Sequence, residues 1–384
     1  MIAKSKGDAL PRLLVIGAGP AGVSTALRLR DRGADVLLVD RDIFPRDKVC
    51  GCCLNLAAIK SLARIDCDRL ITSRCTSSLT RWEMRIGSRR VESALPGGVA
   101  IRRRTMDAAL IEEAIRRGIQ VRIGCEARVL DVSDHDVRVT LRMADAETLS
   151  ASFDSVVFAS GLSGGGVSRW LPFTRSPTGP MGVGMILDSV DSVAPQTIHM
   201  ICGSAGYVGL VQLEDGRIGM AAAIRRNEPS AARLDRYQIA IRVDRLLREA
   251  AMPVLAAEHL ERLQMTPPLT RSRRVGLGGL IAVGDAARYS EPFTGQGMAW
   301  AIESGIEAAD CIADRLTLNN SQRATLADHW SPRYRMLSRR RQWICQAMSA
   351  GLRSAPISAW LIPLMRVAPW SVNFAINQLN RGRE

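Results

Sequence analysis

The sequence LLVIGAGPAGVSTALRLRDRGADVLLVD, from Leu13 to Asp40, decides the fold expected for this chain. Residues 13–16 are apolar, as in a buried parallel strand, and a second β-type run covers residues 36–39. Between the two runs, a glycine-rich turn leads into apolar residues at helical spacing. This order of strand, turn, helix and strand predicts a Rossmann-like α/β unit.

The turn has the form G-x-G-x-x-G, in which each glycine has its own role. Gly17 permits the tight turn, Gly19 lets the backbone approach a pyrophosphate, and Gly22 lets the helix pack close to the strand. Ala21 lies at the helix start, whose free N–H groups favour a phosphate. Asp40 ends the second strand, where a carboxylate can accept hydrogen bonds from an adenosine ribose. The stretch predicts dinucleotide binding and leaves FAD and NAD as alternatives.

A second signature of the same kind lies far along the chain. Residues 280–283 are apolar and are followed directly by Gly284 and Asp285, a carboxylate at the end of a strand. Gly295, Gly297 and Met298 then open a long helix that is expected to reach residue 316. Two glycine-and-carboxylate corners are what the two ends of one extended cofactor require.

The loop after Asp40 is basic and rich in cysteine. Arg46 and Lys48 are placed to meet phosphate or a polarised carbonyl, and a solvated basic loop is the alternative. Three thiols follow closely, at Cys50, Cys52 and Cys53. Structural zinc needs four ligands, usually as two spaced pairs, and no second cluster follows, so we expect no metal site.

Composition narrows the class of protein further. The 384 residues are 47% hydrophobic, carry a formal net charge of +14 and include nine cysteines, which we interpret as reduced thiols. The four Tyr and six Phe do not alternate with the basic residues, which argues against nucleic acid as a partner. We find no signal-like segment and no apolar run long enough to span a bilayer, so we expect a cytoplasmic protein.

Together these motifs resemble the glutathione-reductase-type FAD superfamily. Within it, the chain looks like the geranylgeranyl reductase branch and its relatives among flavin hydroxylases and halogenases. The resemblance rests on GAGPAG with Asp40, the RDKVCG loop, the segment from Arg103 to Asp107, and GDAARYSEPFTGQGMAWAIESG. It implies a non-covalent FAD, with NAD(P)H as a candidate external electron donor. The implied FAD-binding residues are Gly17, Gly19, Ala21, Gly22, Asp40, Arg41, Arg46, Cys50, Gly51, Arg103, Gly284, Asp285, Gly295, Gly297 and Met298.

The chain departs from the family pattern in three places. Cys52 stands where the family's C-G-G has its second glycine, and Ser160 replaces the aspartate of the hydroxylase D-G motif. The aromatic Y-x-W-x-F-P strand of the reductase branch retains only its tyrosine, at Tyr207. These departures bear on the substrate and on the direction of the reaction.

The expected architecture is a Rossmann-like FAD-binding domain with an inserted β-sheet substrate domain and a C-terminal helical tail. The FAD-binding domain comprises residues 1–80, 101–176 and 269–325. Residues 81–100 and 177–268 form the substrate domain, and residues 326–384 form the basic helical region. The tail holds nine arginines and one acidic residue from position 331 onward. Its apolar residues Trp360, Leu361, Leu364 and Trp370 suggest either a packed cap or a surface for lipid or an acidic carrier protein.

These observations predict an FAD-dependent oxidoreductase that reduces or dehydrogenates a carbon–carbon bond. The expected partner is a hydrophobic small molecule, or a substrate tethered to an acyl or aryl carrier protein. One alternative is an FAD-dependent monooxygenase or halogenase, and another is an electron-transfer or interaction flavoprotein. Tyr207, Cys50 and His199 are the catalytic candidates, although a His without a visible partner is more often a packed residue.

Overall fold

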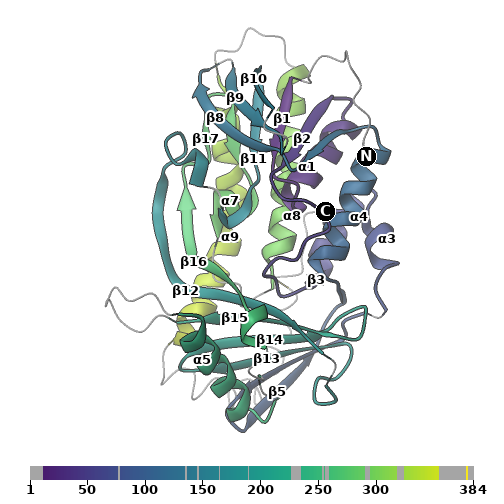
Figure 1. Ribbon diagram of the computed structural model, residues 1–384, viewed down its shortest axis with the longest axis vertical. Coiled ribbons are helices and arrows are strands. Elements are labelled where there is room, and N and C mark those ends of the chain that lie inside the picture. The colour runs from purple at the N-terminus through teal and green to yellow at the C-terminus, as the bar shows by residue number, and fades with distance from the viewer. Residues whose placement is uncertain are drawn as a thin grey trace.

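The protein folds into two layered units joined by several crossings of the chain (Figure 1). The computed structural model describes residues 12–76, 78–134, 136–144, 147–163, 165–188, 190–225, 235–252, 255, 259–289, 295–317, 324–353 and 378. Its described strands form sheets of six, three, eight and two strands. Figure 1 shows the six-stranded sheet with its helices above the eight-stranded sheet.

The six-stranded sheet has the order β17-β18-β11-β1-β2-β7. Its strands are β1 (Leu13–Ile16), β2 (Val36–Asp40), β7 (Gln120–Ile123), β11 (Ser155–Phe158), β17 (Gly276–Leu277) and β18 (Leu280–Ala282). β1 is parallel to both β2 and β11, and β11 is parallel to β18. The glycine-and-carboxylate motif of residues 13–40 and the one at Gly284–Asp285 therefore lie at the same edge of one sheet. This confirms the Rossmann-like fold expected from the sequence.

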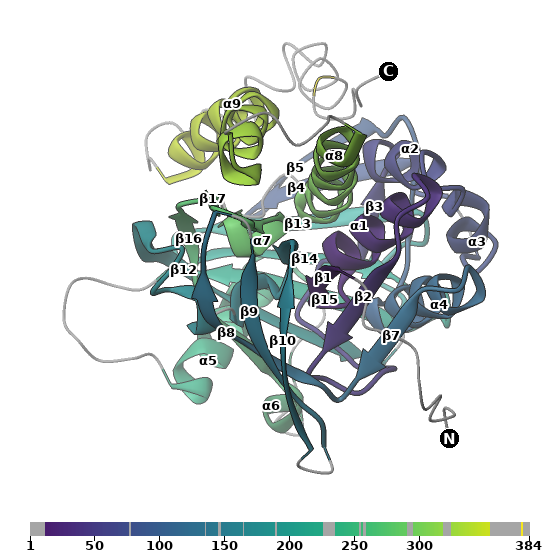
Figure 2. The same cartoon turned by 90° about the horizontal axis from the view of Figure 1, so that it is seen from above.

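Two helices from distant parts of the chain pack tightly beside this sheet. They are α1 (Pro20–Asp31) and α8 (Gly297–Thr317), which lie side by side in both views (Figures 1 and 2). A Cβ atom on Gly305 of α8 would lie 2.2 Å from the Ala21 carbonyl oxygen and 2.9 Å from Thr25 Oγ1. Only glycine allows this close approach, so α8 packs directly against the start of α1.

The eight-stranded sheet has the order β19-β16-β12-β15-β14-β13-β4-β5. Its strands are β4 (Arg81–Ile86), β5 (Arg89–Ala94), β12 (Phe173–Leu187), β13 (Thr197–Gly203), β14 (Gly206–Gln212), β15 (Ile218–Ile224), β16 (Gln264–Arg273) and β19 (Arg288–Tyr289). One face packs against α5 (Arg236–Glu249) through residues such as Ile201, Val208 and Leu210. The opposite face carries Met84, Met200 and Tyr207. This second apolar face lies toward the six-stranded unit.

The division into domains stays a prediction, but the strands run past its expected limits. β12 begins at Phe173 rather than at residue 177, and β16 continues through Pro267 and Pro268 to Arg273. The prolines are tolerated because β19 pairs with β16 only at Arg271 and Ser272, so the proline stretch has a free edge. The β12–β16 pairing is also bulged on this side, where Met181 is opposite Pro268.

The smaller elements complete the unit around the parallel sheet. β8 (Glu126–Val132), β9 (Val137–Arg142) and β10 (Thr148–Phe153) form an antiparallel meander, and β3 (Cys53–Asn55) pairs with β6 (Gly98–Ala100). β6 was expected in the substrate sheet, but it closes the cysteine loop instead. The remaining helices are α2 (Leu56–Ala63), α3 (Asp68–Thr72), α4 (Arg103–Arg116), α6 (His259–Arg262), α7 (Gly284–Ala287), η1 (Gly161–Ser163) and η2 (Gly165–Val167).

The basic helix α9 (Leu326–Arg353) packs on the parallel sheet through Trp330. Trp330 is fully buried, and its Nε1 donates a hydrogen bond to the Ala282 carbonyl at 3.0 Å. Trp360, Leu361, Leu364 and Trp370 lie outside the described residues, so the cap and the docking surface both stay predictions. Among the described helices, none is long and apolar enough to cross a membrane.

Replacing Trp330 with alanine is expected to lower the free energy of unfolding by about 3–5 kcal/mol, because it removes a fully buried indole and its hydrogen bond. Urea denaturation followed by circular dichroism measures this loss. Met336 on the same helix is 72% exposed, and its alanine variant should stay within about 0.5 kcal/mol of the wild type. Equal effects of the two variants would show that α9 is not anchored through Trp330.

Candidate FAD site

The glycine turn is held in a geometry that excludes larger side chains. Gly17 has a positive φ of 111°, and a Cβ there would lie 2.6 Å from the carbonyl oxygen of Ala159, the residue that follows β11. A Cβ on Gly22 would lie only 1.7 Å from the Gly17 carbonyl oxygen. The turn therefore brings the N-terminus of α1 against the ends of β1 and β11. Its N–H groups and the positive end of the helix dipole are suited to a pyrophosphate.

Asp40 closes this turn from the end of β2. Its carboxylate accepts hydrogen bonds from the backbone N–H groups of Ala18, at 2.7 Å, and Asp42, at 2.8 Å. Asp40 is buried, and a carboxylate has lone pairs beyond the two used here. Its contact with a ribose stays a prediction, while its role in holding the turn is visible. Arg41 is exposed and pairs with Asp42 at 3.6 Å.

The second corner touches the first directly. Gly284 has a φ of 56°, and a Cβ there would lie 3.0 Å from Ala21 Cβ at the start of α1. The Gly284 N–H donates to Ser304 Oγ of α8 at 2.9 Å. Asp285 follows in α7, close enough to the start of α1 for one ligand to reach both. The two motifs predicted from the sequence therefore come together in space.

A buried ion pair lies beside the glycine turn. Arg103, at the start of α4, donates from Nε and Nη2 to both oxygens of Asp107, at 2.9 and 2.7 Å. Its Nη2 is 3.6 Å from the position that a Gly19 Cβ would occupy. Burial opposes ionisation of Arg103, but Asp107 more than offsets it and raises the arginine pKa. Arg46 contacts the same Asp107 carboxylate at 3.7 Å. A fixed positive charge thus faces the predicted phosphate position.

Charges from three further segments converge on Asp285. Burial raises the pKa of Asp285, whereas Lys48, Arg103 and Arg271 lower it. Burial lowers the pKa of Lys48, and the nearby Arg103 and Arg46 lower it further. Lys48 Nζ is 2.9 Å from the position of a Gly161 Cβ, so Ser160-Gly161 lies against this lysine. The cluster supplies positive charge next to the expected ribityl and phosphate groups.

The cysteine loop lies between the two large sheets. Val49 packs over Gly184 of β12, and Cys52 over Gly219 of β15, where added Cβ atoms would meet them at 3.0 and 3.5 Å. Cys50 Sγ lies 3.8 Å from the sulfur of Met298 at the start of α8. A hydrogen bond from the Cys52 side chain lowers the pKa of Cys50 to about 6, against the effect of burial, and Arg103 lowers it further.

We expect Cys50 to react with iodoacetamide faster as the pH rises, with a half-maximal rate at about pH 6. The thiolate is the nucleophile, so a lowered pKa moves the reactive form into the neutral range. Peptide mass spectrometry measures labelling at each cysteine. Cys75 has a pKa that burial raises to about 11 and serves as the internal control. Labelling of Cys50 only in alkaline buffer would contradict the lowered pKa.

Among the described residues, three glycines near the expected flavin position have no close neighbours. No heavy atom of the described residues, beyond the chain neighbours, would lie within 4 Å of a Cβ on Gly51, Gly295 or Gly297. Gly295 also has a positive φ of 62° and precedes α8, whose N-terminal dipole favours negative charge on a reduced flavin. The residues present therefore fit FAD, with its pyrophosphate at the α1 turn and its flavin beside Cys50 and Met298.

The other catalytic candidates lie in the eight-stranded sheet but on opposite faces. Tyr207 is buried on the face toward the FAD unit, together with Met200 and Met84. His199 is 3% exposed, and its Nδ1 lies 3.0 Å from Glu83 Oε1. Its side chain points to the α5 face, because Met200 next to it points to the opposite one. Of the two, Tyr207 is therefore on the side that faces the flavin.

Two residues that sequence reasoning missed belong to the cluster. Asp107 is 1% exposed and orients Arg103; it ends the Arg103–Asp107 segment of the family resemblance, and its i+4 spacing from Arg103 is the sequence signal for this pairing. Arg271 of β16 is buried and donates to the Gly161 carbonyl at 3.1 Å. Nothing in the sequence relates β16 to residue 161. The described residues contain no group of His, Cys, Asp or Glu that could hold a metal ion.

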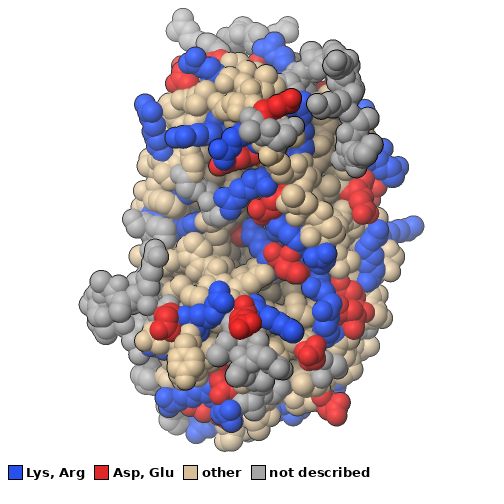
Figure 3. Space-filling view, in the orientation of Figure 1, with Lys and Arg blue, Asp and Glu red and all other residues tan. Residues whose placement is uncertain are grey.

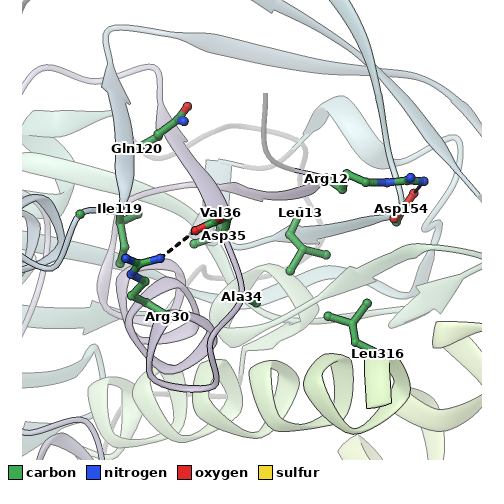
Figure 4. A pocket seen from close by; sticks show the side chains of 11 residues that line it. Arg12, Leu13, Arg30, Ala34, Asp35, Val36, Ile119, Gln120, Asp154 and Leu316 are labelled. Atoms are coloured by element: carbon green, nitrogen blue, oxygen red, sulfur yellow. Dashed lines mark hydrogen bonds and ion pairs between the residues drawn. The ribbon is translucent and has the colours of Figure 1, made fainter. Parts of the chain in front are cut away.

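One cavity of about 490 Å³ lies away from this cluster, at the opposite edge of the parallel sheet. Leu13, Val36 and Gln120, the first residues of three strands, line it (Figure 4). Arg30 and Asp35 at its rim are paired at 2.7 Å. Ligands of such sheets bind at the carboxyl ends of the strands, so this cavity is not the cofactor site.

Basic side chains are interspersed with acidic ones over the face of the molecule that Figure 3 shows.

Comparison with curated proteins gives relatives along most of the chain. The digeranylgeranylglycerophospholipid reductase of Methanosarcina acetivorans is 27% identical over 338 residues, covering 84% of this chain and 80% of the relative. The menaquinone reductase of Mycobacterium tuberculosis is 25% identical over 319 residues, covering 79% and 76%.

Comparison with solved structures bears out the fold. The myxobacterial chondrochloren halogenase superposes with a TM-score of 0.78 at 18% identity, covering 97% of this chain and 96% of the halogenase. The sequence profile described as FAD binding domain matches residues 12–333, which include both corners and the cysteine loop. The chain therefore belongs to the FAD binding domain family and is an FAD-dependent oxidoreductase.

Proposed function

We propose that this protein uses FAD to reduce a carbon–carbon double bond in an apolar substrate. The observation that carries the proposal is the apolar face of the eight-stranded sheet, which lies toward the FAD unit. Met84, Met200 and Tyr207 on this face cluster with Leu162 of η1 and Tyr289 of β19, which border the Asp285 corner. The centre of this cluster is buried, so we propose that the apolar substrate binds at its margin, where Leu162 and Tyr289 are only partly buried and the expected flavin is near.

The chain's own residues supply position and a proton. Bound reduced FAD supplies the hydride. The opposite carbon of the double bond then needs a proton, for which the Tyr207 hydroxyl is our first candidate on this side of the sheet. The Cys50 thiol is a weaker candidate, because its lowered pKa leaves it less protonated at neutral pH. Cys50 lies beside the start of α8, and Tyr207 lies in β14. His199 is a weaker candidate, since it faces α5 and pairs with Glu83.

The names of the relatives support this reaction class. One is named for a digeranylgeranylglycerophospholipid and the other for menaquinone, and both are named reductases. We extend to this chain only the shared chemistry, reduction within a long apolar molecule. We propose NAD(P)H as the external electron donor. The apolar substrate is proposed as a free molecule or, alternatively, as one tethered to a carrier protein.

Anaerobic single-turnover mixing tests the proposal. The flavin is reduced, mixed with digeranylgeranylglycerophospholipid or menaquinone in detergent, and followed by its absorbance, with product mass measured afterwards. Reoxidation of the flavin with a gain of two hydrogens at a carbon–carbon double bond of either compound supports the proposal. For menaquinone the mass is measured after the quinol ring has been reoxidised in air, so that only a saturated double bond retains the added hydrogens. No reoxidation by either compound, together with an oxygen-dependent product in a parallel aerobic reaction, contradicts it.

A monooxygenase or halogenase is the second candidate, because the fold superposes on a flavin-dependent halogenase. Mixing the reduced protein with oxygen distinguishes the two reactions. Direct return of the oxidised flavin spectrum fits the reductase, whereas an absorbing transient before it fits the oxygen-using reaction. An electron-transfer flavoprotein would instead form a complex with an acidic protein and turn over neither compound.

We also propose that the basic C-terminal region docks the protein on anionic lipid, which would give access to apolar substrates. The support is the nine arginines after position 330 and the exposed Met336 of α9. Flotation with phosphatidylglycerol vesicles at low and high salt tests this. We expect binding that salt weakens, and an absence of binding at low salt would contradict it.

A further inference from the structure

The cysteine loop contains more thiol chemistry than reduction of a double bond requires. Cys50, Cys52 and Cys53 lie within four consecutive residues, and all three are free. Cys52 stands where the family pattern has glycine, and it adopts the left-handed φ of 54° that favours glycine. A side chain with that conformational cost points to a role for the sulfur itself.

The geometry joins Cys50 and Cys52 and leaves Cys53 aside. The Cys52 backbone N–H donates to Cys50 Sγ at 3.3 Å, and Cys52 Sγ lies 3.7 Å from the Cys50 carbonyl oxygen. Each thiol therefore lies against the backbone of the other cysteine within one three-residue loop. Cys53 Sγ instead donates to the Gly51 carbonyl at 3.1 Å.

The other described thiols are poor competitors for oxidation. Burial raises the pKa of Cys67 and Cys202 to about 12, and of Cys75 and Cys311 to about 11. At neutral pH these groups are thiols, which are weak nucleophiles. The pKa of Cys50, by contrast, is lowered to about 6 by Cys52 and by Arg103, which outweigh the effect of burial. Attack on an oxidant is therefore directed to Cys50.

We propose that Cys50 and Cys52 form a reversible disulfide, a second two-electron centre next to the FAD. The Cys50 thiolate attacks one sulfur of a small disulfide such as oxidised glutathione and expels its other half as a thiolate. Cys52 then loses its proton and attacks Cys50, which expels the second half. The two protein thiols lose two electrons and two protons, and the small disulfide becomes two thiols. Oxidised FAD can accept the same two electrons and two protons, which links the dithiol to the flavin.

Thiol counting on the FAD-loaded protein tests the proposal without relying on turnover. The protein is equilibrated in glutathione buffers of varied redox ratio, quenched in acid, alkylated and mapped by peptide mass spectrometry. Cys52→Gly removes one thiol and suits the left-handed φ, which offsets the loss of a small buried side chain, so we expect this variant to fold. Cys53→Ser keeps a donor for the Gly51 carbonyl and is the matched control.

We expect the wild type and Cys53→Ser to lose two alkylatable thiols together. Peptide mass spectrometry should then show a disulfide that links Cys50 to Cys52. Cys52→Gly should instead stop at a mixed disulfide between Cys50 and glutathione. Dithiothreitol should restore every thiol. A linkage that includes Cys53, a persistent mixed disulfide at Cys50 in the wild type, or no oxidation in pure oxidised glutathione would overturn the proposal. None of these readings depends on the identity of the substrate.

Discussion

Substitution of Gly22 by alanine is expected to yield a colourless and destabilised protein. The added Cβ would lie 1.7 Å from the Gly17 carbonyl oxygen, which is backbone and cannot turn away as a side chain could. Relief requires that α1 move off the ends of β1 and β11, and Gly305 of α8 allows no room for this. We expect a loss of about 3 kcal/mol or more in the free energy of unfolding, the upper range for over-packing.

The measurement is the ratio of flavin to protein absorbance after purification with added FAD, followed by urea denaturation. Gly166→Ala is the matched control, because Gly166 is exposed and no described atom lies within 4 Å of its Cβ position. It should retain full flavin and a stability within about 0.5 kcal/mol of the wild type. A yellow Gly22→Ala protein of normal stability would refute the described packing of the turn.

The second large effect is expected at Arg103. Replacing it with methionine leaves the buried Asp107 carboxylate without its two-point partner, which costs about 3–5 kcal/mol of stability. It also removes the positive charge 3.6 Å from the Gly19 Cβ position. We expect FAD affinity to fall by about 10- to 100-fold, the range for loss of one charged hydrogen bond.

A double variant separates these two consequences. Arg103→Met with Asp107→Leu removes the stranded charge and should recover most of the stability. It should not recover FAD affinity, because the cation that faces the phosphates is still missing. Fluorescence titration of the apoprotein with FAD and urea denaturation measure the two quantities. Recovery of both together would mean that Arg103 only supports the fold.

Local sequence predicted the corners well because glycine and strand-end carboxylates are constrained by short-range sterics. Gly17 and Gly22 could be assigned from their spacing, since their roles depend on contacts with the next few residues and one neighbouring strand. The convergence of Asp285 on the first corner followed from the rule that parallel strands present their carboxyl ends at one edge. The fold and a dinucleotide site could therefore be predicted from the residues themselves, whereas the choice of FAD over NAD depended on the family resemblance.

Features that depend on sheet order were not accessible. β4 pairs in parallel with β13, a neighbour about a hundred residues later, and alternation alone fixes a side chain's face but not the partner strand. His199 and Tyr207 were equal candidates until the register placed them on opposite faces. Arg271 joined the cluster only because β16 runs past two prolines into the FAD unit. The replacement of the family's second glycine by Cys52 could be read from the sequence. The pairing of Cys52 with Cys50 could be inferred only from the contacts within the loop.

One FAD is expected to span the two glycine-rich segments that meet at Ala21 and Gly284. A crystal structure of the protein with FAD would show whether it does. We expect the pyrophosphate at the Gly17–Gly22 turn beside Arg103, and the flavin ring next to Cys50 and the start of α8. A flavin bound elsewhere, or a protein that takes up no FAD, would refute this arrangement.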